Sequence, residues 1–157
     1  MTKLDCLIVR QPYASLIAFG LKRWEFRSYE TKKTGIIGIA ASNAEPLRTK
    51  NIELNRILHL LPTGVVFATA NLVTSFFVTA NDLKQFLTEP VTVTLHGYQV
   101  KTLGEPLGEP IEDVRAAANN DKWQSFSWLL EDVKPLERRI PFERNSQSTW
   151  STVELQP

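Results

Sequence analysis

Apolar and polar residues alternate along the first forty positions in a pattern that predicts short strands and one helix. An apolar run of strand length occupies 4–9, and Pro12 opens a helix that Gly20 ends. Large apolar and charged side chains then alternate through 24–29 with a period of two, which is typical of a half-buried strand. A continuous apolar run at 36–41 predicts the next strand.

The middle of the chain predicts a second helix, a long strand and a third, shorter helix. Apolar residues recur at helical spacing in 46–62, a stretch bounded by two prolines. The β-rich run at 65–78 is too long for one flat strand, so we expect a bend or bulge near Asn71. Residues 79–82 resemble a capping box, which predicts a short helix at 83–87.

Further strands are expected toward the C-terminus. Residues 91–100 alternate as a strand does, 111–118 can form an acidic helix, and 126–130 and 139–142 have the pattern of closing strands. The chain thus predicts five or six short strands that two or three helices interrupt without regular alternation. That combination favours an α+β fold, in which a small mixed β-barrel is decorated by helices.

The length of 157 residues fits one domain, 1–157, that can exist as a monomer. Its stretch 104–110 repeats Gly-Glu-Pro, and we expect the surrounding 101–122 to be a loop insertion. The sequence has no apolar run of 18 residues, no secretory signal and only one cysteine, Cys6, so we expect a cytoplasmic protein without membrane contact. Its two histidines have no cysteine or acidic cluster beside them, so we expect neither a metal nor a cofactor.

Charge is unevenly distributed along the chain, although the formal net charge is only +1. Residues 1–80 hold ten basic and five acidic side chains, whereas 81–132 hold four basic and nine acidic ones. A polyanion such as nucleic acid is expected on the basic half. The alternative is that folding mixes the two segments and neutralises the asymmetry.

Three charged side chains converge where the first helix ends and the next strand begins. Gly20 can end the helix at little conformational cost, and Lys22 follows in the turn. Glu25 and Arg27 are two positions apart and therefore share one face of the strand. A carboxylate between two cations stays ionised, and the cluster can bind a phosphate or the polar edge of a base. The alternative is a surface ion-pair network that only holds the helix to the strand.

The same region resembles a known protein family. Four residues fit the pattern Gly-x-Lys-x-x-Glu-x-Arg of the ASCH (activating signal cointegrator homology) family: Gly20, Lys22, Glu25 and Arg27. Gln-Pro-aromatic-Ala-Ser-Leu from Gln11, Arg-Ser-aromatic from Arg27, and Gly-x-x-x-Ile-Ala-Ala from Gly35 are similar to its transcription-coactivator branch. The resemblance implies a PUA-like barrel that binds nucleic acid, single-stranded or structured RNA first, in a cleft lined by this motif, with a role in transcription or RNA regulation.

Some ASCH proteins are enzymes, which keeps a catalytic alternative open. One bacterial group hydrolyses N4-acetylcytidine with a lysine, a threonine and a glutamate, and ribonuclease activity is associated with another. Lys22 matches that lysine, but Glu25 stands at the threonine position, and the glutamate position falls near Asn71. Because Glu25 cannot replace a hydroxyl nucleophile, an enzyme here would use Lys22 as base or electrophile and Glu25 as acid or base.

Neighbouring polar and aromatic residues extend the candidate site. Tyr13 and Tyr29 are the aromatic residues expected at the wall of the cleft, where they can stack on an unpaired base. Ser42 and Asn43 can hydrogen-bond a base edge or cap their own loop, and a regular strand turns Ser28 away from the other motif side chains. The full set of candidate binding residues is Gln11, Tyr13, Lys22, Glu25, Arg27, Ser28, Tyr29, Ser42 and Asn43.

Three functions follow from these observations. The first is a nucleic-acid-binding module that uses Lys22, Glu25 and Arg27 in its cleft. The second is a hydrolase that acts on RNA or on a modified nucleoside. The third is a domain that binds a small molecule or a protein partner, in which the motif is mainly structural.

Overall fold

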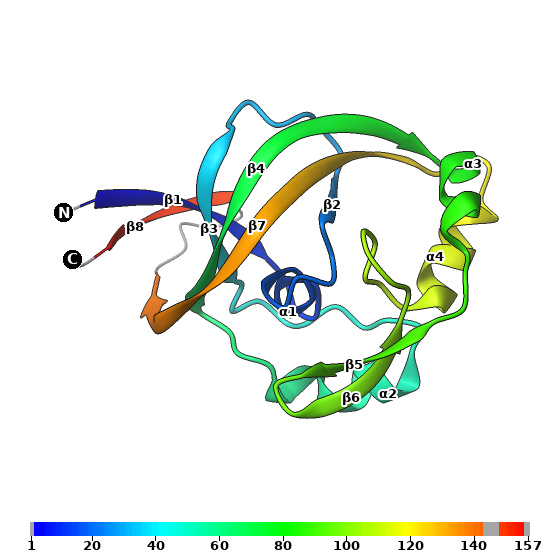
Figure 1. Ribbon diagram of the computed structural model, residues 1–157, viewed down its shortest axis with the longest axis horizontal. Coiled ribbons are helices and arrows are strands. Elements are labelled where there is room, and N and C mark those ends of the chain that lie inside the picture. The colour runs from blue at the N-terminus through cyan, green and yellow to red at the C-terminus, as the bar shows by residue number, and fades with distance from the viewer. Residues whose placement is uncertain (1, 143–147, 156–157) are drawn as a thin grey trace.

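A strongly curved six-stranded sheet forms most of the computed structural model, which describes residues 2–142 and 148–155 (Figure 1). The strands are β1 (Thr2–Val9), β2 (Trp24–Arg27), β3 (Gly35–Ala41), β4 (Val65–Thr79), β5 (Val91–Leu95), β6 (Tyr98–Thr102), β7 (Gln124–Pro141) and β8 (Trp150–Leu155). The helices are α1 (Tyr13–Ala18), α2 (Ile52–Ile57), α3 (Ala80–Leu83) and α4 (Ile111–Ala118), with 3-10 turns at Leu58–Leu60 and Lys84–Phe86. The α+β class expected from the sequence is confirmed.

The order of the strands explains how distant parts of the chain meet. The large sheet runs β2-β7-β4-β3-β1-β8, and β5 and β6 form a separate hairpin. β1 and β3 are parallel neighbours, and parallel strands need a crossover connection. Here the crossover carries α1 and then β2, which pairs with β7 at the far edge of the sheet. The segment between β1 and β3 therefore spans the concave side of the sheet.

The short helix α1 lies inside the curve of the sheet (Figure 1). A helix of six residues is marginal on its own, so its packing has to stabilise it. Ile17 belongs to a core cluster with Leu7, Ile39 and Trp128, and each of these four side chains is at most 1% exposed. The first half of the chain and β7 are thus joined in one core.

Two predicted strands near the C-terminus are one continuous strand in the structure. β7 runs through 124–141 without a break, whereas the apolar pattern had predicted separate strands at 126–130 and 139–142. Its central residues are mostly charged and largely exposed, so the apolar pattern did not reveal that the strand continues through them. The bulge expected near Asn71 is confirmed, since the pairing of β4 with β7 shifts register between Thr69 and Asn71 and at two further places.

The alternating stretch 91–100 was predicted as one strand, and this is wrong. It is the first part of the β5–β6 hairpin, which turns at His96 and Gly97. Both residues have positive φ, 48° and 88°, as a two-residue hairpin turn of the primed type requires. Alternation continues through such a tight turn, so the hydrophobic pattern alone could not reveal it.

Two helix starts show the role of side-chain caps. The helix expected after Pro46 begins only at Ile52, because the Asn51 side chain accepts a hydrogen bond from the Leu54 N–H and so fixes the start there. The capping box at Thr79–Asp82 is confirmed, but its cap is Thr79, so α3 begins at Ala80 rather than at the predicted residue 83, and a 3-10 turn at Lys84–Phe86 follows it. None of the helices in the described part of the chain has the length and apolar character needed to cross a bilayer.

The segment 101–122, expected to be a loop insertion, is packed against the rest of the domain. Leu103 and Leu107 are buried with Val78 and Leu83, and Val114 of α4 joins the same cluster. The irregular stretch between β6 and α4 also contacts the start of β2, since the Pro106 carbonyl accepts hydrogen bonds from the Arg23 and Trp24 N–H groups.

Cys6 and Gly38 are opposite each other in the parallel β1–β3 pair. The Cys6 thiol is fully buried, and this burial raises its pKa to about 11, so it is an unreactive core group. A Cβ atom on Gly38 would lie 2.5 Å from the Cys6 Sγ and 3.1 Å from a methyl group of Val66. The glycine is therefore needed for space at this position.

We predict that Gly38→Ala lowers the free energy of unfolding by about 1–3 kcal/mol, because the added methyl group overpacks the core. Urea denaturation of Gly38→Ala, Cys6→Ala and the double variant would test this. The double variant should be more stable than the two single losses added together, since removing Sγ makes room for the methyl group. Strict additivity would show that the two sites do not crowd each other.

Candidate functional site

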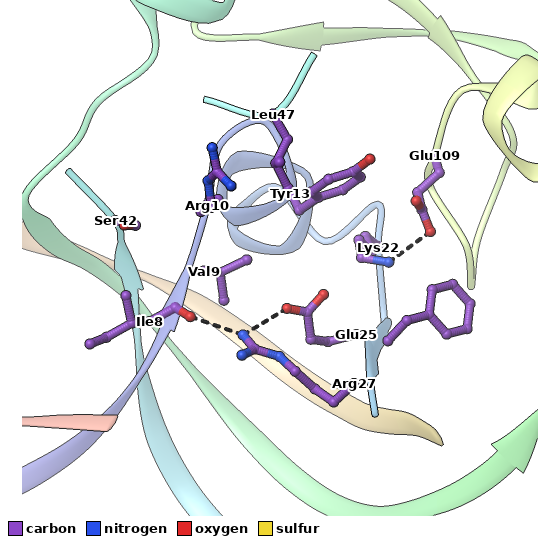
Figure 2. A pocket seen from close by; sticks show the side chains of 11 residues that line it. Ile8, Val9, Arg10, Tyr13, Lys22, Glu25, Arg27, Ser42, Leu47 and Glu109 are labelled. Carbon is purple, nitrogen blue, oxygen red and sulfur yellow. Dashed lines mark hydrogen bonds and ion pairs between the residues drawn. The ribbon is translucent and has the colours of Figure 1, made fainter. Parts of the chain in front are cut away.

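A cleft of about 390 Å³ opens where the end of β1, α1 and β2 meet (Figure 2). The segment after β3 supplies Ser42 and Leu47 on one side, and the loop before α4 supplies Glu109 on the other. The lining residues are Ile8, Val9, Arg10, Tyr13, Lys22, Glu25, Phe26, Arg27, Ser42, Leu47 and Glu109. The cleft is thus built from the crossover segment and closed by a loop from the second half of the chain.

Lys22 reaches the cleft because of how α1 ends. Gly20 adopts φ 78°, and the N–H groups of Leu21 and Lys22 both donate to the Leu16 carbonyl at 3.0 Å. This turn directs the Lys22 side chain inward, where it is only 1% exposed. Its Nζ donates to Glu109 Oε2 at 2.8 Å and lies 4.6 Å from the centre of the Phe26 ring. Lys22 therefore forms a buried ion pair rather than part of a surface network.

The loop before α4 delivers Glu109 to this lysine. The Pro106 carbonyl accepts hydrogen bonds from the N–H groups of Arg23 and Trp24, at 2.7 and 3.3 Å. Gly108 has φ +62°, and a Cβ atom there would come within 2.6 Å of the backbone nitrogen of Lys22 and would overlap the Leu21 carbonyl. Only a residue without a side chain permits this approach, which brings the next carboxylate onto Lys22.

Burial raises the pKa of Glu109 above its ordinary value of 4.5, although the charge of Lys22 opposes the shift. The folded protein therefore binds this proton more tightly than the unfolded chain does. As a result, the carboxyl group lowers the stability of the fold above its folded pKa, and this cost disappears below 4.5. Burial also raises the pKa of Tyr13, helped by the carboxylates of Glu109, Asp113 and Glu25, so its phenol stays protonated.

Glu25 and Arg27 form a second ion pair in the same cleft. Arg27 Nη2 donates to Glu25 Oε2 at 3.0 Å and to the Ile8 carbonyl at 2.9 Å, as Figure 2 shows. The guanidinium also lies 5.8 Å from the centre of the buried Trp128 ring. Because β2 is paired with β7 at both positions, these two side chains start from a rigid backbone. The expectation that they share one strand face is confirmed.

Five of the nine predicted binding residues line the cleft: Tyr13, Lys22, Glu25, Arg27 and Ser42. Tyr13 comes from α1, with its ring 5.6 Å from Lys22 Nζ. Ser42 follows β3 directly, is buried, and accepts a hydrogen bond from the Ala44 N–H through its hydroxyl. Its predicted alternative role as a loop cap is therefore present in the structure.

The other four predicted residues do not line this cleft. Gln11 is fully buried, donates to the Pro62 carbonyl at 2.7 Å and accepts from the Ser15 N–H at 3.0 Å, so it holds α1 in place. Ser28 and Asn43 are exposed beyond the ends of β2 and β3. Tyr29 is 45% exposed and is hydrogen-bonded to the Thr149 hydroxyl. These residues were predicted to bind because they are close to the motif in sequence. Closeness in sequence did not bring their side chains into the cleft.

Sequence reasoning missed two charged residues of the cleft, Glu109 and Arg10. Glu109 is 87 residues from its partner Lys22, and its only local signal was the Gly-Glu-Pro repeat, whose glycine permits the close approach. Arg10 follows β1, and its guanidinium donates to the Glu45 carbonyl. The Lys22–Glu109 pair also shows that folding mixes the basic and acidic segments at this site.

The described residues contain no group of three His, Cys, Asp or Glu side chains placed to hold a metal ion. The polar groups of the cleft include two ion pairs and the hydroxyl groups of Tyr13 and Ser42.

A family model describes the residues that build this cleft. The model of the ASCH domain matches residues 7–138, which include every residue of the lining. The chain belongs to the ASCH family. The resemblance of the Gly20–Arg27 pattern is thus confirmed by a match over most of the chain.

Solved structures of ASCH proteins share this fold. A crystal structure of the ASCH protein from Zymomonas mobilis is 16% identical, with a TM-score of 0.50, over 97% of this chain and 87% of the other. A tyrosine-to-phenylalanine variant of that protein is 17% identical, with a TM-score of 0.50, over 99% of this chain and 91% of the other. A serine-to-alanine variant is 15% identical, with a TM-score of 0.52, over 96% of this chain and 87% of the other. At this identity the likeness shows the fold alone, and it confirms the PUA-like class. No curated protein sequence matches the chain.

We predict that Lys22→Met lowers the free energy of unfolding of this ASCH domain by about 3 kcal/mol at pH 7, because it leaves Glu109 buried and unpaired. The loss should shrink as the pH is lowered, since losing the cation raises the pKa of Glu109 further and protonation removes the buried charge. Urea denaturation at pH 7 and pH 5 measures both effects.

The double variant Lys22→Met/Glu109→Leu is the matched control for this experiment. It removes both charges and should recover most of the stability that Lys22→Met loses. A Lys22→Met domain as stable as the wild type at pH 7 would contradict the assignment of a buried, mutually dependent pair.

Proposed function

We propose that this ASCH domain binds single-stranded or structured RNA and takes one unpaired base into the cleft. The observation that supports the proposal is that two ion pairs, Lys22–Glu109 and Arg27–Glu25, lie in one open cleft. They place N–H donors and carboxylate acceptors side by side. The edge of a base carries donors and acceptors in the same way, and single-stranded RNA is recognised by hydrogen bonds to such edges.

The size and walls of the cleft support a single base as the ligand. Its volume of about 390 Å³ lies in the range of pockets for small organic groups. Tyr13, Val9 and Leu47 provide aromatic and apolar wall, against which a planar ring can pack. An RNA duplex keeps its bases stacked and is contacted across its grooves, so it could not fill this space.

The charge balance favours a base over a phosphate in the cleft. Three cations line it, Arg10, Lys22 and Arg27, and the carboxylates of Glu25 and Glu109 oppose two of them. A phosphate placed there would meet both carboxylates at close range, which disfavours it. We therefore place the base inside and the sugar-phosphate backbone at the mouth, where exposed cations of the basic N-terminal half can approach it.

Arg27→Gln is the variant that tests this proposal most directly, with Arg23→Gln as its control. Arg23→Gln removes the same charge four positions earlier in the chain, but Arg23 pairs with Glu131 outside the cleft. We expect Arg27→Gln to weaken single-stranded RNA binding by tenfold or more, since one such base contact contributes about 1–3 kcal/mol. Arg23→Gln should bind like the wild type. Fluorescence anisotropy with labelled RNA decamers of each base measures the dissociation constants.

The same titrations with duplex RNA and with DNA, at two salt concentrations, complete the test. For the wild type, log affinity should fall with log salt by about 0.7 per phosphate contacted, and Arg27→Gln should keep that slope. Equal losses in both arginine variants would show a nonspecific charge effect instead. Absence of binding to all three nucleic acids would overturn the proposal and favour a small-molecule or protein ligand.

A second candidate function is a hydrolase acting on RNA or on a modified nucleoside, and one observation favours it. Glu109 is a carboxyl group with a raised pKa, in contact with a buried lysine and open to the cleft. Perturbed groups of this kind are frequent in active sites, where a general acid or base needs a pKa close to the working pH. In this candidate Glu109 transfers the proton and Lys22 and Glu25 orient the ligand.

Incubation of the same RNAs, followed by gel electrophoresis and chromatography of nucleosides, tests the hydrolase candidate. Turnover that disappears in Glu109→Gln, while circular dichroism and melting temperature show a retained fold, would place the enzyme first. We expect binding without product, and in that case Glu109→Gln alters affinity only. Product formation that is equal in wild type and Glu109→Gln would point to a contaminant.

A further inference from the structure

Tyr29 is an exposed aromatic residue that the cleft does not use. It follows β2 directly, is 45% exposed, and packs its ring edge-to-face against Trp128 with 5.7 Å between the ring centres. The buried Trp128 indole N–H donates to the Tyr29 carbonyl at 2.8 Å, which fixes the backbone as well. The ring is thus held in place with much of its surface in water, where it can contact a ligand.

A short series of contacts joins Tyr29 to the mouth of the cleft. Arg27, which lines the cleft, donates to the Ile8 carbonyl, and the Ile8 N–H donates to the Thr149 carbonyl at 2.9 Å. The Thr149 hydroxyl is in turn hydrogen-bonded to the Tyr29 hydroxyl at 2.6 Å. Tyr29 therefore lies beside the cleft on the β1 side, and one bound chain can reach both places.

The surroundings of Tyr29 are aromatic and cationic. Trp150 stacks on Trp128 at 6.0 Å with an interplanar angle of 23°, and Lys33 Nζ lies 5.1 Å from the centre of the Trp150 ring. Lys33 also pairs with Asp5 at 2.8 Å, and the neighbouring Lys32 is exposed. Aromatic rings interleaved with cations are the arrangement on which successive bases of a single strand stack while the backbone is neutralised.

We propose that the ring of Tyr29 is a second, stacking subsite for the nucleotide adjacent to the one whose base enters the cleft. The inference rests on the proposed RNA-binding function and names the substrate class more closely: a single strand of at least two nucleotides, with the first base read by hydrogen bonds and its neighbour held by stacking. Because every base has an aromatic face, this subsite accepts all four bases.

Tyr29→Leu is the variant that tests the subsite, because leucine keeps apolar packing on Trp128 and loses the aromatic face. We expect it to weaken binding of single-stranded RNA decamers by about tenfold, the loss typical of one stacked base. Tyr29→Phe keeps the ring and loses only the hydrogen bond to Thr149, so it should bind within twofold of the wild type. Melting temperatures of all variants verify the fold.

Tyr98→Leu is the matched control, since Tyr98 is 42% exposed but is part of the separate β5–β6 hairpin. It should leave RNA affinity unchanged. Wild-type affinity in Tyr29→Leu, or equal losses in Tyr29→Leu and Tyr29→Phe, would overturn the stacking subsite. If Arg27→Gln still weakens binding in those cases, the proposed function stands and only this inference fails, whereas no RNA binding by the wild type removes both.

Discussion

The buried ion pair of Lys22 and Glu109 is the interaction on which the arrangement of the site depends. A lysine that is 1% exposed needs a compensating charge, since an unpaired buried ammonium group is strongly unfavourable. Its partner comes from a loop that reaches it only because Gly108 lets the backbone pass against Leu21 and Lys22. The pair thus joins the end of α1 to the segment before α4. It also forms one wall of the cleft.

The second pair gives the cleft its rigidity. Arg27 is held by Glu25, by the Ile8 carbonyl and by the face of Trp128, and its strand is paired with β7. A recognition group held in this way loses little side-chain freedom when a ligand binds, so more of the contact energy is retained as affinity. Trp128 also packs edge-to-face against the Tyr29 ring and donates a hydrogen bond to the Tyr29 carbonyl. One buried ring therefore contacts both the cleft and the proposed stacking subsite.

The topology explains why these groups meet at all. The parallel pairing of β1 and β3 forces the chain to cross the concave side of the sheet, and α1 and β2 are formed on that crossing. Gln11 holds α1 in place through hydrogen bonds to the Pro62 carbonyl and the Ser15 N–H. Its position in the motif had predicted a ligand contact, but its role is structural. Ile8 and Arg10, at the end of β1, then face the motif across the cleft.

The sequence by itself determined the features that depend on local order. Apolar runs predicted β1 and β3, alternation predicted β2, and Pro12 and Gly20 marked the ends of the first helix. The spacing of Glu25 and Arg27 placed both on one strand face, and the Gly20–Arg27 pattern identified the family. Each of these depends on residues close together in the chain. Only the tertiary structure decided which charge completes the site. Glu109 is 87 positions from Lys22, and no local pattern records a contact made by a loop after five intervening strands. The same limit applies to Tyr29, whose position outside the cleft is set by Trp128 and Thr149, two residues contributed by the far end of the chain.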